Sequence, residues 1–324
     1  MKSMKAVQLY HSCKAEDMVL ADVSVPKVKP GWILIRVKAF GLNHSEVILR
    51  KFEIENDYIQ KPIIPGIECV GEVEESLEKD FVKGEKVMAL MGGMGRSFNG
   101  SYAEFCLVPV SHCFHIKNTT LSWTSLAAVG ETYFTAWGSL FESLNLQPQD
   151  HLLVRGSTST VGQSAVQIAS KFGCRVTAAA RNNKKFDLLK SIGATDCIID
   201  DNPLSTSLKE EDKPTKILEL IGPNTLIDSL HAVKKGGIVC NTGILGDVFF
   251  LNNFDPIKDI PNRVFLSSFF SNYPTQQTID DIFMFIDKHN ITPIISKIFP
   301  FKDISTAHAI LEAGKSGGKI VIEI

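Results

Sequence analysis

The sequence contains no long hydrophobic run and no long basic run, and we expect no secretory leader. No stretch approaches the roughly 20 apolar residues that are needed to cross a bilayer. The first residues, MKSMKAVQ, lack the apolar core of a signal peptide, so we expect a cytoplasmic protein. A formal net charge of −2 over 324 residues argues against nucleic acid or an anionic membrane as the main partner.

Cysteine pairs are also absent. The seven cysteines are scattered, and none lies in a C-x-x-C pair. Most stand in apolar, strand-like runs, which favours reduced and buried thiols in a cytoplasmic protein. The composition, 44% hydrophobic and 22% charged, is ordinary for a soluble globular protein, and the chain is long enough for two domains.

The most informative segment, residues 151–173, combines an apolar run, a turn of small residues and a helical pattern. The apolar run is 152–154, and small residues extend from 156 to 162. In a strand, turn and helix of this kind, the free N–H groups and the dipole of the helix N-terminus attract an anion. The segment therefore predicts the phosphate-binding start of a dinucleotide-binding β-α-β unit.

This turn lacks the middle glycine of the G-x-G-x-x-G pattern. Thr158 stands in its place, and Ser159 and Thr160 follow. Small hydroxyl residues still let the backbone approach a phosphate closely, and their side chains can donate to its oxygens. The alternative is an ordinary Ser/Thr-rich turn in an α/β protein that binds no nucleotide.

The rest of the middle region favours the nucleotide. Short apolar runs predict further strands at 175–180, 193–199, 216–221 and 237–243, and a second helix is predicted at 184–192. Strands that alternate with helices at this spacing imply a parallel, doubly wound sheet.

The chain before residue 120 has a different pattern. Alternating or apolar runs at 4–9, 32–41 and 86–90 are separated by Pro/Gly turns, which predicts a mostly β domain. Residues 121–144 are predicted to be helical and to carry the chain to the next domain. The apolar segment 317–324 is predicted to be a strand that returns to the N-terminal domain.

Several motifs, taken in order, carry a family resemblance. They are GLNHSE with Arg50 (41–50), PIIPGIECVGEV (62–73), FVKGEKV (81–87), GSYAE (100–104), LAA (126–128), FTAW (134–137) and GKIV (318–321). Over essentially the whole chain, this layout resembles the medium-chain dehydrogenase/reductase superfamily, and most of all its zinc-free quinone oxidoreductase-like branch.

The resemblance implies an α/β protein of two domains. A GroES-like, mostly-β catalytic domain would cover 1–120 and 286–324, and a Rossmann domain with a doubly wound parallel sheet would cover 121–285 and bind NADPH. Relatives hold the nicotinamide in a cleft between these domains, and they commonly form homodimers through an edge of the nucleotide-domain sheet. The alternating run 264–270 fits either such a dimer edge or a covered internal strand.

The residues argue against zinc. Zinc-dependent relatives carry a ligand cysteine where this chain has Asn43, and a ligand histidine where it has Ile67. Their structural zinc lobe would fall near residues 90–110, where this chain has MGGMGRSFNGSY at 91–102, without a thiol. Tetrahedral zinc needs closely grouped Cys or His ligands. Cys106, His112, Cys113 and His115 are close in sequence, but we interpret them as strand and turn packing, and we expect no metal.

The end of the second Rossmann strand favours NADPH over NADH. An acidic residue there would bind the ribose hydroxyls of NAD, but this strand is followed by Arg181. A guanidinium can bind a 2′-phosphate bidentately, and the family places Lys185 near that phosphate. The alternative is that Arg181 is only a solvated charge. Asp200 stands where relatives often have a tyrosine near the adenine phosphate.

The resemblance also implies roles for single residues. Asn43 and Thr135 would lie near the nicotinamide, the segment after the fifth strand would pass along the ring, and 269–272 would form its far wall. The candidate cofactor-binding residues are Asn43, Thr135, Ser157, Ser159, Thr160, Val161, Arg181, Lys185, Thr242, Gly243, Phe269 and Ser271. The candidate catalytic residues are Asn43 and Arg50, whereas His44 is more readily explained as a structural histidine.

We therefore expect a zinc-independent oxidoreductase that transfers a hydride from NADPH to a quinone or an α,β-unsaturated carbonyl compound. Such a site must orient the ring, exclude water and stabilise the negative charge that develops on the acceptor. Two alternatives share the fold: a non-catalytic NADPH-binding protein, and a zinc-type alcohol dehydrogenase, which the missing ligands oppose.

Overall fold

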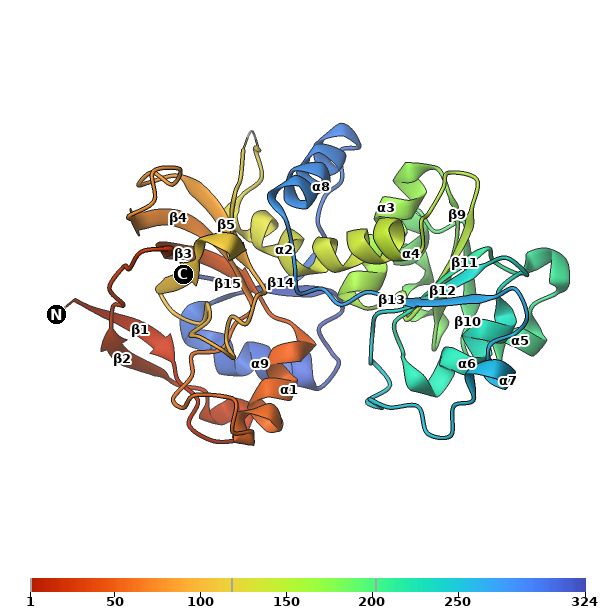
Figure 1. The fold of residues 1–324 in the computed structure, drawn as a ribbon, viewed down its shortest axis with the longest axis horizontal. Helices are drawn as coiled ribbons and strands as arrows, with labels where there is room; N and C mark the ends of the chain where they lie inside the picture. The colour runs from red at the N-terminus through yellow and green to blue at the C-terminus, as the bar shows by residue number, and fades with distance from the viewer. Residues whose placement is uncertain (1, 118, 202) are drawn as a thin grey trace. The chain divides into compact units, whose positions relative to one another are not determined.

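The computed structural model describes residues 2–117, 119–201 and 203–324, which form two compact units (Figure 1). The first unit is Met1–Phe134 with Asn272–Ile324, and the second is Thr135–Ser271. The sequence predicted boundaries near 120 and 285 instead. Two contacts explain the difference: the N–H of Glu131 donates to Glu68 of the first unit, and Gln276 exchanges hydrogen bonds with the backbone of His115.

The first unit is mostly β, as expected. Its strands are β1 (Ser3–Val7), β2 (Leu20–Ser24), β3 (Trp32–Gly41), β4 (Glu68–Ser76), β5 (Lys86–Leu90), β6 (Phe105–Pro109), β7 (Cys113–His115), β14 (Ile295–Pro300) and β15 (Lys319–Glu323). Its helices are α1 (His44–Lys51), most of α2 (Trp123–Trp137), α8 (Gln276–Lys288) and α9 (Ile304–Glu312), with short turns η1 (Ala15–Asp17), η2 (Glu53–Glu55), η3 (Val110–His112) and η7 (Phe301–Asp303).

The C-terminal strand lies inside the sheet of this first unit. The strand order is β14-β15-β3-β4-β5-β7, with β6 also paired to β3. β15 runs antiparallel to β3, with Val321 opposite Gly41, and parallel to β14. The prediction that the chain end returns to the N-terminal domain is therefore confirmed.

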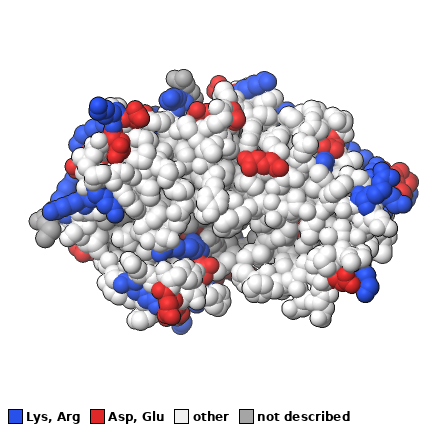
Figure 2. Space-filling view, in the orientation of Figure 1, with Lys and Arg blue, Asp and Glu red and all other residues white. Residues whose placement is uncertain are grey.

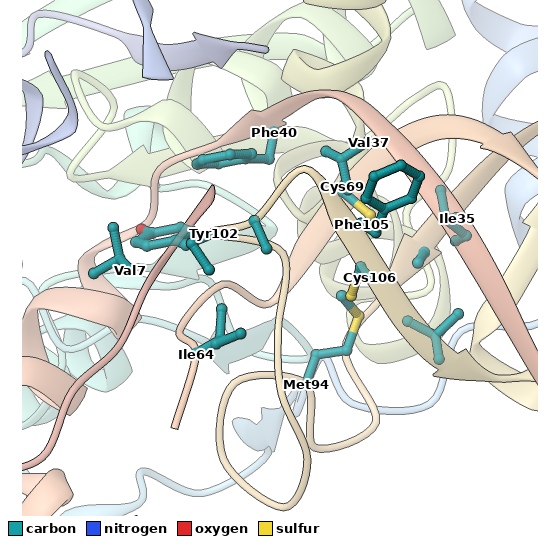
Figure 3. Packing of buried hydrophobic residues seen from close by; sticks show 14 of the residues in the cluster. Val7, Ile35, Val37, Phe40, Ile64, Cys69, Met94, Tyr102, Phe105 and Cys106 are labelled. Carbon is teal, nitrogen blue, oxygen red and sulfur yellow. The ribbon is translucent and has the colours of Figure 1, made fainter. Parts of the chain in front are cut away.

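The core of the first unit consists of side chains from its strands and from the loops that cross them. Figure 3 shows Phe40 of β3 lying ring to ring with Tyr102, at a centroid distance of 4.8 Å. Cys69, Cys106 and Met94 lie together in another part of the same core. The cysteines that the sequence placed in apolar runs are free thiols, and most of them are buried.

The second unit has the predicted doubly wound sheet. Its strands are β8 (His151–Arg155), β9 (Arg175–Ala180), β10 (Asp196–Ile199), β11 (Lys216–Glu219), β12 (Ile238–Asn241) and β13 (Phe265–Ser268). All pair in parallel, in the order β10-β9-β8-β11-β12-β13. Counted from β8 this is 3-2-1-4-5-6, the dinucleotide-binding order, so the α/β fold class is confirmed.

Helices cover both faces of this sheet. They are α3 (Thr160–Phe172), α4 (Phe186–Ser191), α5 (Leu204–Ser207), α6 (Pro223–Ala232) and α7 (Pro256–Asp259), with short turns η4 (Gly138–Ser143, a π-helix), η5 (Asn183–Lys185) and η6 (Glu210–Asp212). Figure 1 shows α3 and α4 on one face and α5 and α6 on the other. Strand β13, left open by the sequence, is the last strand in the order and forms an edge.

Two further properties of the structure are the distribution of surface charge and the apolar length of the helices. On the face that Figure 2 shows, basic and acidic side chains are interspersed, without an extended basic surface. Across the described ranges, no helix combines the length and the apolar character that spanning a membrane requires.

Candidate functional site

Each unit contains one half of the predicted site. In the first unit, four polar residues from three elements meet below the surface. Asn43 precedes α1, Glu46 lies in its first turn, Glu68 begins β4 and Lys319 begins β15. Their exposed fractions are 8%, 0%, 1% and 2%. We call these four residues the buried polar cluster.

Hydrogen bonds link the whole cluster. Lys319 Nζ donates to Asn43 Oδ1 at 2.6 Å and to Glu68 Oε1 at 2.7 Å. Asn43 Nδ2 donates to the same Glu68 oxygen at 2.9 Å. The backbone N–H of Asn43 donates to Glu46 Oε2 at 2.9 Å, and that of Ile67 donates to Glu46 Oε1 at 3.2 Å. Buried charges are tolerated only when they are paired and hydrogen-bonded in this way.

Two glycines make room for the pair of charges. A Cβ atom on Gly41 would lie 2.2 Å from Lys319 Cε and 2.5 Å from Glu68 Oε1. A Cβ on Gly130 would lie 2.1 Å from Glu68 Oε2. Helix α2 is kinked at Gly130 (φ −16°, ψ −113°), and the next N–H, that of Glu131, donates to Glu68 Oε2 at 2.7 Å. The backbone of α2 at Gly130 and Glu131 therefore lies directly against the Glu68 carboxylate.

The pKa of the Glu46 carboxyl group lies above its ordinary value. Burial and the nearby Glu68 carboxylate raise the pKa of Glu46 to about 7, while Lys319, the Ile67 N–H and Arg96 act in the opposite direction. This carboxyl group therefore changes its charge near neutral pH.

The donor set at this position does not fit zinc. Where zinc-dependent relatives would present a cysteine and a histidine, this chain has an amide and the apolar Ile67, and an ammonium group is hydrogen-bonded to Asn43 and Glu68. Among the described residues, no group of three or more His, Cys, Asp or Glu side chains is placed to hold a metal. His115, weighed above as a zinc ligand, instead bonds Glu85 at 2.6 Å and stacks on Phe81.

Arg50, predicted to be catalytic, has different neighbours. Its guanidinium donates to the Cys13 carbonyl and to the Glu312 carboxylate of α9, and its side chain is 1% exposed. These partners indicate a structural ion pair that ties α1 to α9. Its contact with a substrate stays a prediction that none of these bonds supports. His44, beside Asn43, is half-buried.

In the second unit, the predicted phosphate turn connects β8 to α3. Gly156 adopts a positive φ of 83°, which favours glycine. Ser159 is the N-cap of α3, and its Oγ accepts from the Gly162 N–H at 3.1 Å. A Cβ on Gly162 would lie 2.6 Å from the Gly156 carbonyl oxygen, so glycine is needed where helix and turn approach closely.

The serine hydroxyl groups of this turn form hydrogen bonds with backbone carbonyl groups. Ser157 Oγ donates to the Ala179 carbonyl at 2.8 Å, and Ser159 Oγ donates to the Gly156 carbonyl at 2.9 Å. The sequence suggested that these side chains donate to phosphate oxygens. Because both hydroxyls already donate to backbone carbonyls, backbone N–H groups are the remaining donors for a phosphate. The N–H groups of Thr160 and Val161, in the first turn of the 13-residue α3, lack intrahelical acceptors by geometry.

Two basic residues, Arg181 and Lys185, follow β9, and their contact with a 2′-phosphate stays a prediction. Arg181 is exposed, and no hydrogen bond or ion pair joins it to another residue of the described ranges. Asp200, at the end of the neighbouring strand, is bound by both Arg155 Nε and Nη2 at 2.8 and 2.7 Å. The same guanidinium also binds Asp228, through Nη1 at 2.7 Å, so its positive charge is shared by two carboxylates. Burial lowers the pKa of Lys185, which follows in η5.

The remaining cofactor candidates belong to other elements of this unit. Ser139 Oγ donates to the Thr135 carbonyl at 2.7 Å and bonds the Thr242 hydroxyl at 2.8 Å, so the structure brings Thr135 and Thr242 together. Gly243 lies against the Leu220 backbone, since a Cβ there would be 2.2 Å from its carbonyl oxygen. The Phe269 ring covers Gly138, and Ser271 is a half-buried turn residue.

Sequence reasoning missed Glu46, Glu68 and Lys319 as site residues. Both Glu68 and Lys319 lie within motifs that carried the resemblance, and each is a charged residue inside an apolar run, IPGIECVG and GGKIVI. A charged residue in a buried strand needs a partner of opposite charge, and this requirement could have identified Glu68 and Lys319 from the sequence. Which partner it has depends on the fold.

Comparison with known proteins gives a consistent result. Residues 29–118 match a family model described as alcohol dehydrogenase GroES-like domain, and residues 192–322 match one described as zinc-binding dehydrogenase. A quinone oxidoreductase of Mus musculus is 28% identical over 338 residues, which is 99% of this chain and 98% of that protein. The zinc-type alcohol dehydrogenase-like protein C1773.06c of Schizosaccharomyces pombe is 26% identical over 94% of each chain.

A solved structure, that of mycobacterial Rv1454c complexed with NADPH, is similar to this chain with a TM-score of 0.85. The alignment covers 99% of this chain and 100% of the other, at 22% sequence identity. At that identity the likeness bears on the fold.

Proposed function

The chain belongs to the quinone oxidoreductase-like branch of the medium-chain dehydrogenase/reductase superfamily, and we propose that it reduces quinones or α,β-unsaturated carbonyl compounds with NADPH, without zinc. It is an oxidoreductase of small molecules with a Rossmann unit for a nicotinamide cofactor. The identity of the cofactor, the acceptor and the absence of zinc are the proposed parts.

The buried polar cluster carries this proposal. Where a metal-dependent relative would use zinc to stabilise negative charge on a substrate oxygen, this chain has an ammonium group bound to an amide. Hydrogen-bond donors held in a water-poor site stabilise such charge without a Lewis acid. Asn43 is the donor we assign to the acceptor oxygen, because its Nδ2 has two N–H groups and Glu68 takes one of them.

NADPH is favoured by the charge pattern at β9. The reduced nicotinamide supplies the hydride when bound, and the protein supplies the site that holds it. We assign the diphosphate to the N–H groups of Thr160 and Val161, and the 2′-phosphate to Arg181 and Lys185. The ion pair with Arg155, which Asp228 shares, weakens the repulsion between Asp200 and that phosphate. Thr135 and Thr242 are the assigned contacts of the nicotinamide end.

The test follows oxidation of NADPH and of NADH by a panel of quinones and enones, with and without a metal chelator. We expect turnover that prefers NADPH and resists the chelator. Activity that the chelator abolishes would contradict the zinc-free site. Tight NADPH binding with no turnover of any acceptor would favour the non-catalytic binding protein instead.

Substitution of Arg181 separates the two cofactors. We expect Arg181→Ala to raise the KM for NADPH by about tenfold, the value of one lost charge-assisted hydrogen bond, and to leave the KM for NADH unchanged. The matched control is Lys171→Ala, which removes an exposed charge at the C-terminal end of α3. Equal effects on both cofactors would show that Arg181 does not read the 2′-phosphate.

Two further properties belong to the same proposal. We place the protein in the cytoplasm, since all seven cysteines are free thiols, a state that a reducing compartment maintains. We also propose a homodimer paired through the exposed edge at β13, tested below.

A further inference from the structure

We propose that Lys319 is a positioning residue that fixes the side-chain amide of Asn43 in the orientation needed for hydride transfer. This role rests on the proposed function, in which Asn43 donates to the acceptor oxygen. Lys319 is the last of the cluster residues in the chain and lies 276 residues from Asn43. Through its hydrogen bond to Asn43, Lys319 links β15 to the start of α1.

The chemistry of the contact leaves one amide orientation. An ammonium group has three donors and no acceptor, so the Asn43 atom that lies 2.6 Å from Lys319 Nζ must be the oxygen. The amide nitrogen then faces Glu68 Oε1, an acceptor, at 2.9 Å. The opposite orientation would set NH₂ against NH₃⁺ and oxygen against carboxylate. The pair of charges therefore acts as a lock on the rotation of this amide.

The lock is rigid because each of its parts is anchored in the fold. Lys319 begins β15, whose pairing with β3 is continued by a hydrogen bond from the Leu42 N–H to the Ile320 carbonyl at 3.0 Å. The second oxygen of Glu68 is bound by the Glu131 N–H. The missing side chain at Gly41 leaves the space that the lysine end and the carboxylate fill. A small motion of any one residue would break a bond to another.

The lock also changes the strength of the remaining donor. One Nδ2–H of Asn43 is bound by Glu68, which leaves the other for a ligand. Because Lys319 draws electron density from the amide oxygen, the free N–H becomes a stronger donor. Donors of this kind act on rate when charge develops on the acceptor, so the effect of Lys319 belongs to kcat rather than to cofactor binding.

Steady-state kinetics test the role. We expect Lys319→Met to lower kcat by about a hundredfold, at the low end of the range for a lost oxyanion donor, with the KM for NADPH within about twofold of wild type. Asn43→Ala is expected to lose as much, and adding Lys319→Met to it is expected to cost nothing further. A full additional loss in the Asn43→Ala background would overturn the role.

Lys319→Met leaves Glu68 unpaired and is at risk of not folding. The variant with both Glu68→Met and Lys319→Met has no unpaired charge at this position and removes both sides of the lock, so it is expected to fold and to show the same low kcat. A double variant with wild-type kcat would contradict the proposal.

A measurement without turnover separates this inference from the proposed function. The Asn43 side-chain NH₂ signal in a ¹H–¹⁵N spectrum of the apo protein is assigned by its loss in Asn43→Ala. We expect its two protons to have well-separated shifts in wild type and to move or broaden in the double methionine variant. An unchanged signal would overturn the lock even in an active enzyme. A wild-type protein that shows the lock but reduces no acceptor would instead contradict the proposed function.

Discussion

At the scale of single residues, the partner of a side chain decides its role more than its type does. Ser157 and Ser159 have hydroxyls suited to a phosphate, yet both bond the backbone of their own turn. Arg50 has a guanidinium suited to an anion, yet it binds a carbonyl and a carboxylate of the protein. Asn43 keeps one amide donor after its partners are counted, and it is therefore the residue that we assign to the substrate.

Glu46 gives a prediction for stability against pH. A carboxyl whose pKa rises from 4.5 unfolded to about 7 folded holds its proton longer in the native state. Between these values the native state binds more protons than the unfolded state, so stability falls as pH rises through this window, by roughly 3 kcal/mol for this one group. The charged groups facing Glu46 are Glu68, Lys319 and Arg96.

The variant that tests this is Glu46→Gln, which does not titrate. We expect its unfolding free energy to lack the fall that wild type shows between about pH 5 and pH 8. It should also be less stable than wild type at the lower pH, because both Glu46 oxygens accept from N–H groups and an amide NH₂ cannot. Urea unfolding at the two pH values measures both effects, and a slope equal to that of wild type would refute the shifted pKa.

At the scale of elements, the phosphate turn shows how local sequence sets local geometry. The apolar run became β8, the small residues became a tight turn, and α3 begins at Thr160 under the Ser159 cap. These features follow from neighbours in sequence and were predictable. The start of β10 was less predictable. The sequence predicted a strand from residue 193, but β10 begins at Asp196, because Gly193 lies in a turn with a φ of 117°.

Gly162 is the residue of this element whose change should affect cofactor binding most. A methyl group added there would lie 2.6 Å from the Gly156 oxygen and 2.7 Å from Ser157 Cα, both backbone atoms of the turn. We expect Gly162→Ala to displace the turn and weaken NADPH binding by about tenfold or more, because close contacts to backbone are relieved only by moving it.

Fluorescence titration with NADPH measures this change. The control is Ser164→Ala in the same helix, which loses only a hydroxyl bonded to the Thr160 carbonyl and should bind NADPH within about twofold of wild type. Full affinity in folded Gly162→Ala would mean that NADPH does not use this turn.

At the scale of the whole molecule, the exposed edge of the nucleotide-binding sheet bears on oligomeric state. β13 ends the strand order, and Phe265 on it is 57% exposed. An unpaired edge with exposed apolar side chains readily pairs with a second copy.

We therefore expect the protein to run as a dimer in light scattering, and Phe265→Asp to shift it toward monomer. The control is Met284→Asp, which charges an exposed apolar position on α8 of the first unit and should leave the dimer intact. A wild-type monomer at micromolar concentration, or a dimer that Phe265→Asp does not weaken, would reject pairing through β13.

The sequence by itself determined the fold class, the strand–turn–helix start of the nucleotide-binding unit, the positive charge after β9 and the return of the last strand. Each of these features is predicted by the periodicity, the glycine positions or the charge of a short stretch of sequence. Such patterns depend on residues that are close together in the chain. Only the tertiary structure decided that Glu68 and Lys319 meet at Asn43, that Asp200 is paired with Arg155, and that the turn hydroxyls are already bonded. The reason is physical: hydrogen bonds and buried ion pairs depend on distances of a few ångströms between segments far apart in the chain, and only the packing of the sheet and helices sets those distances.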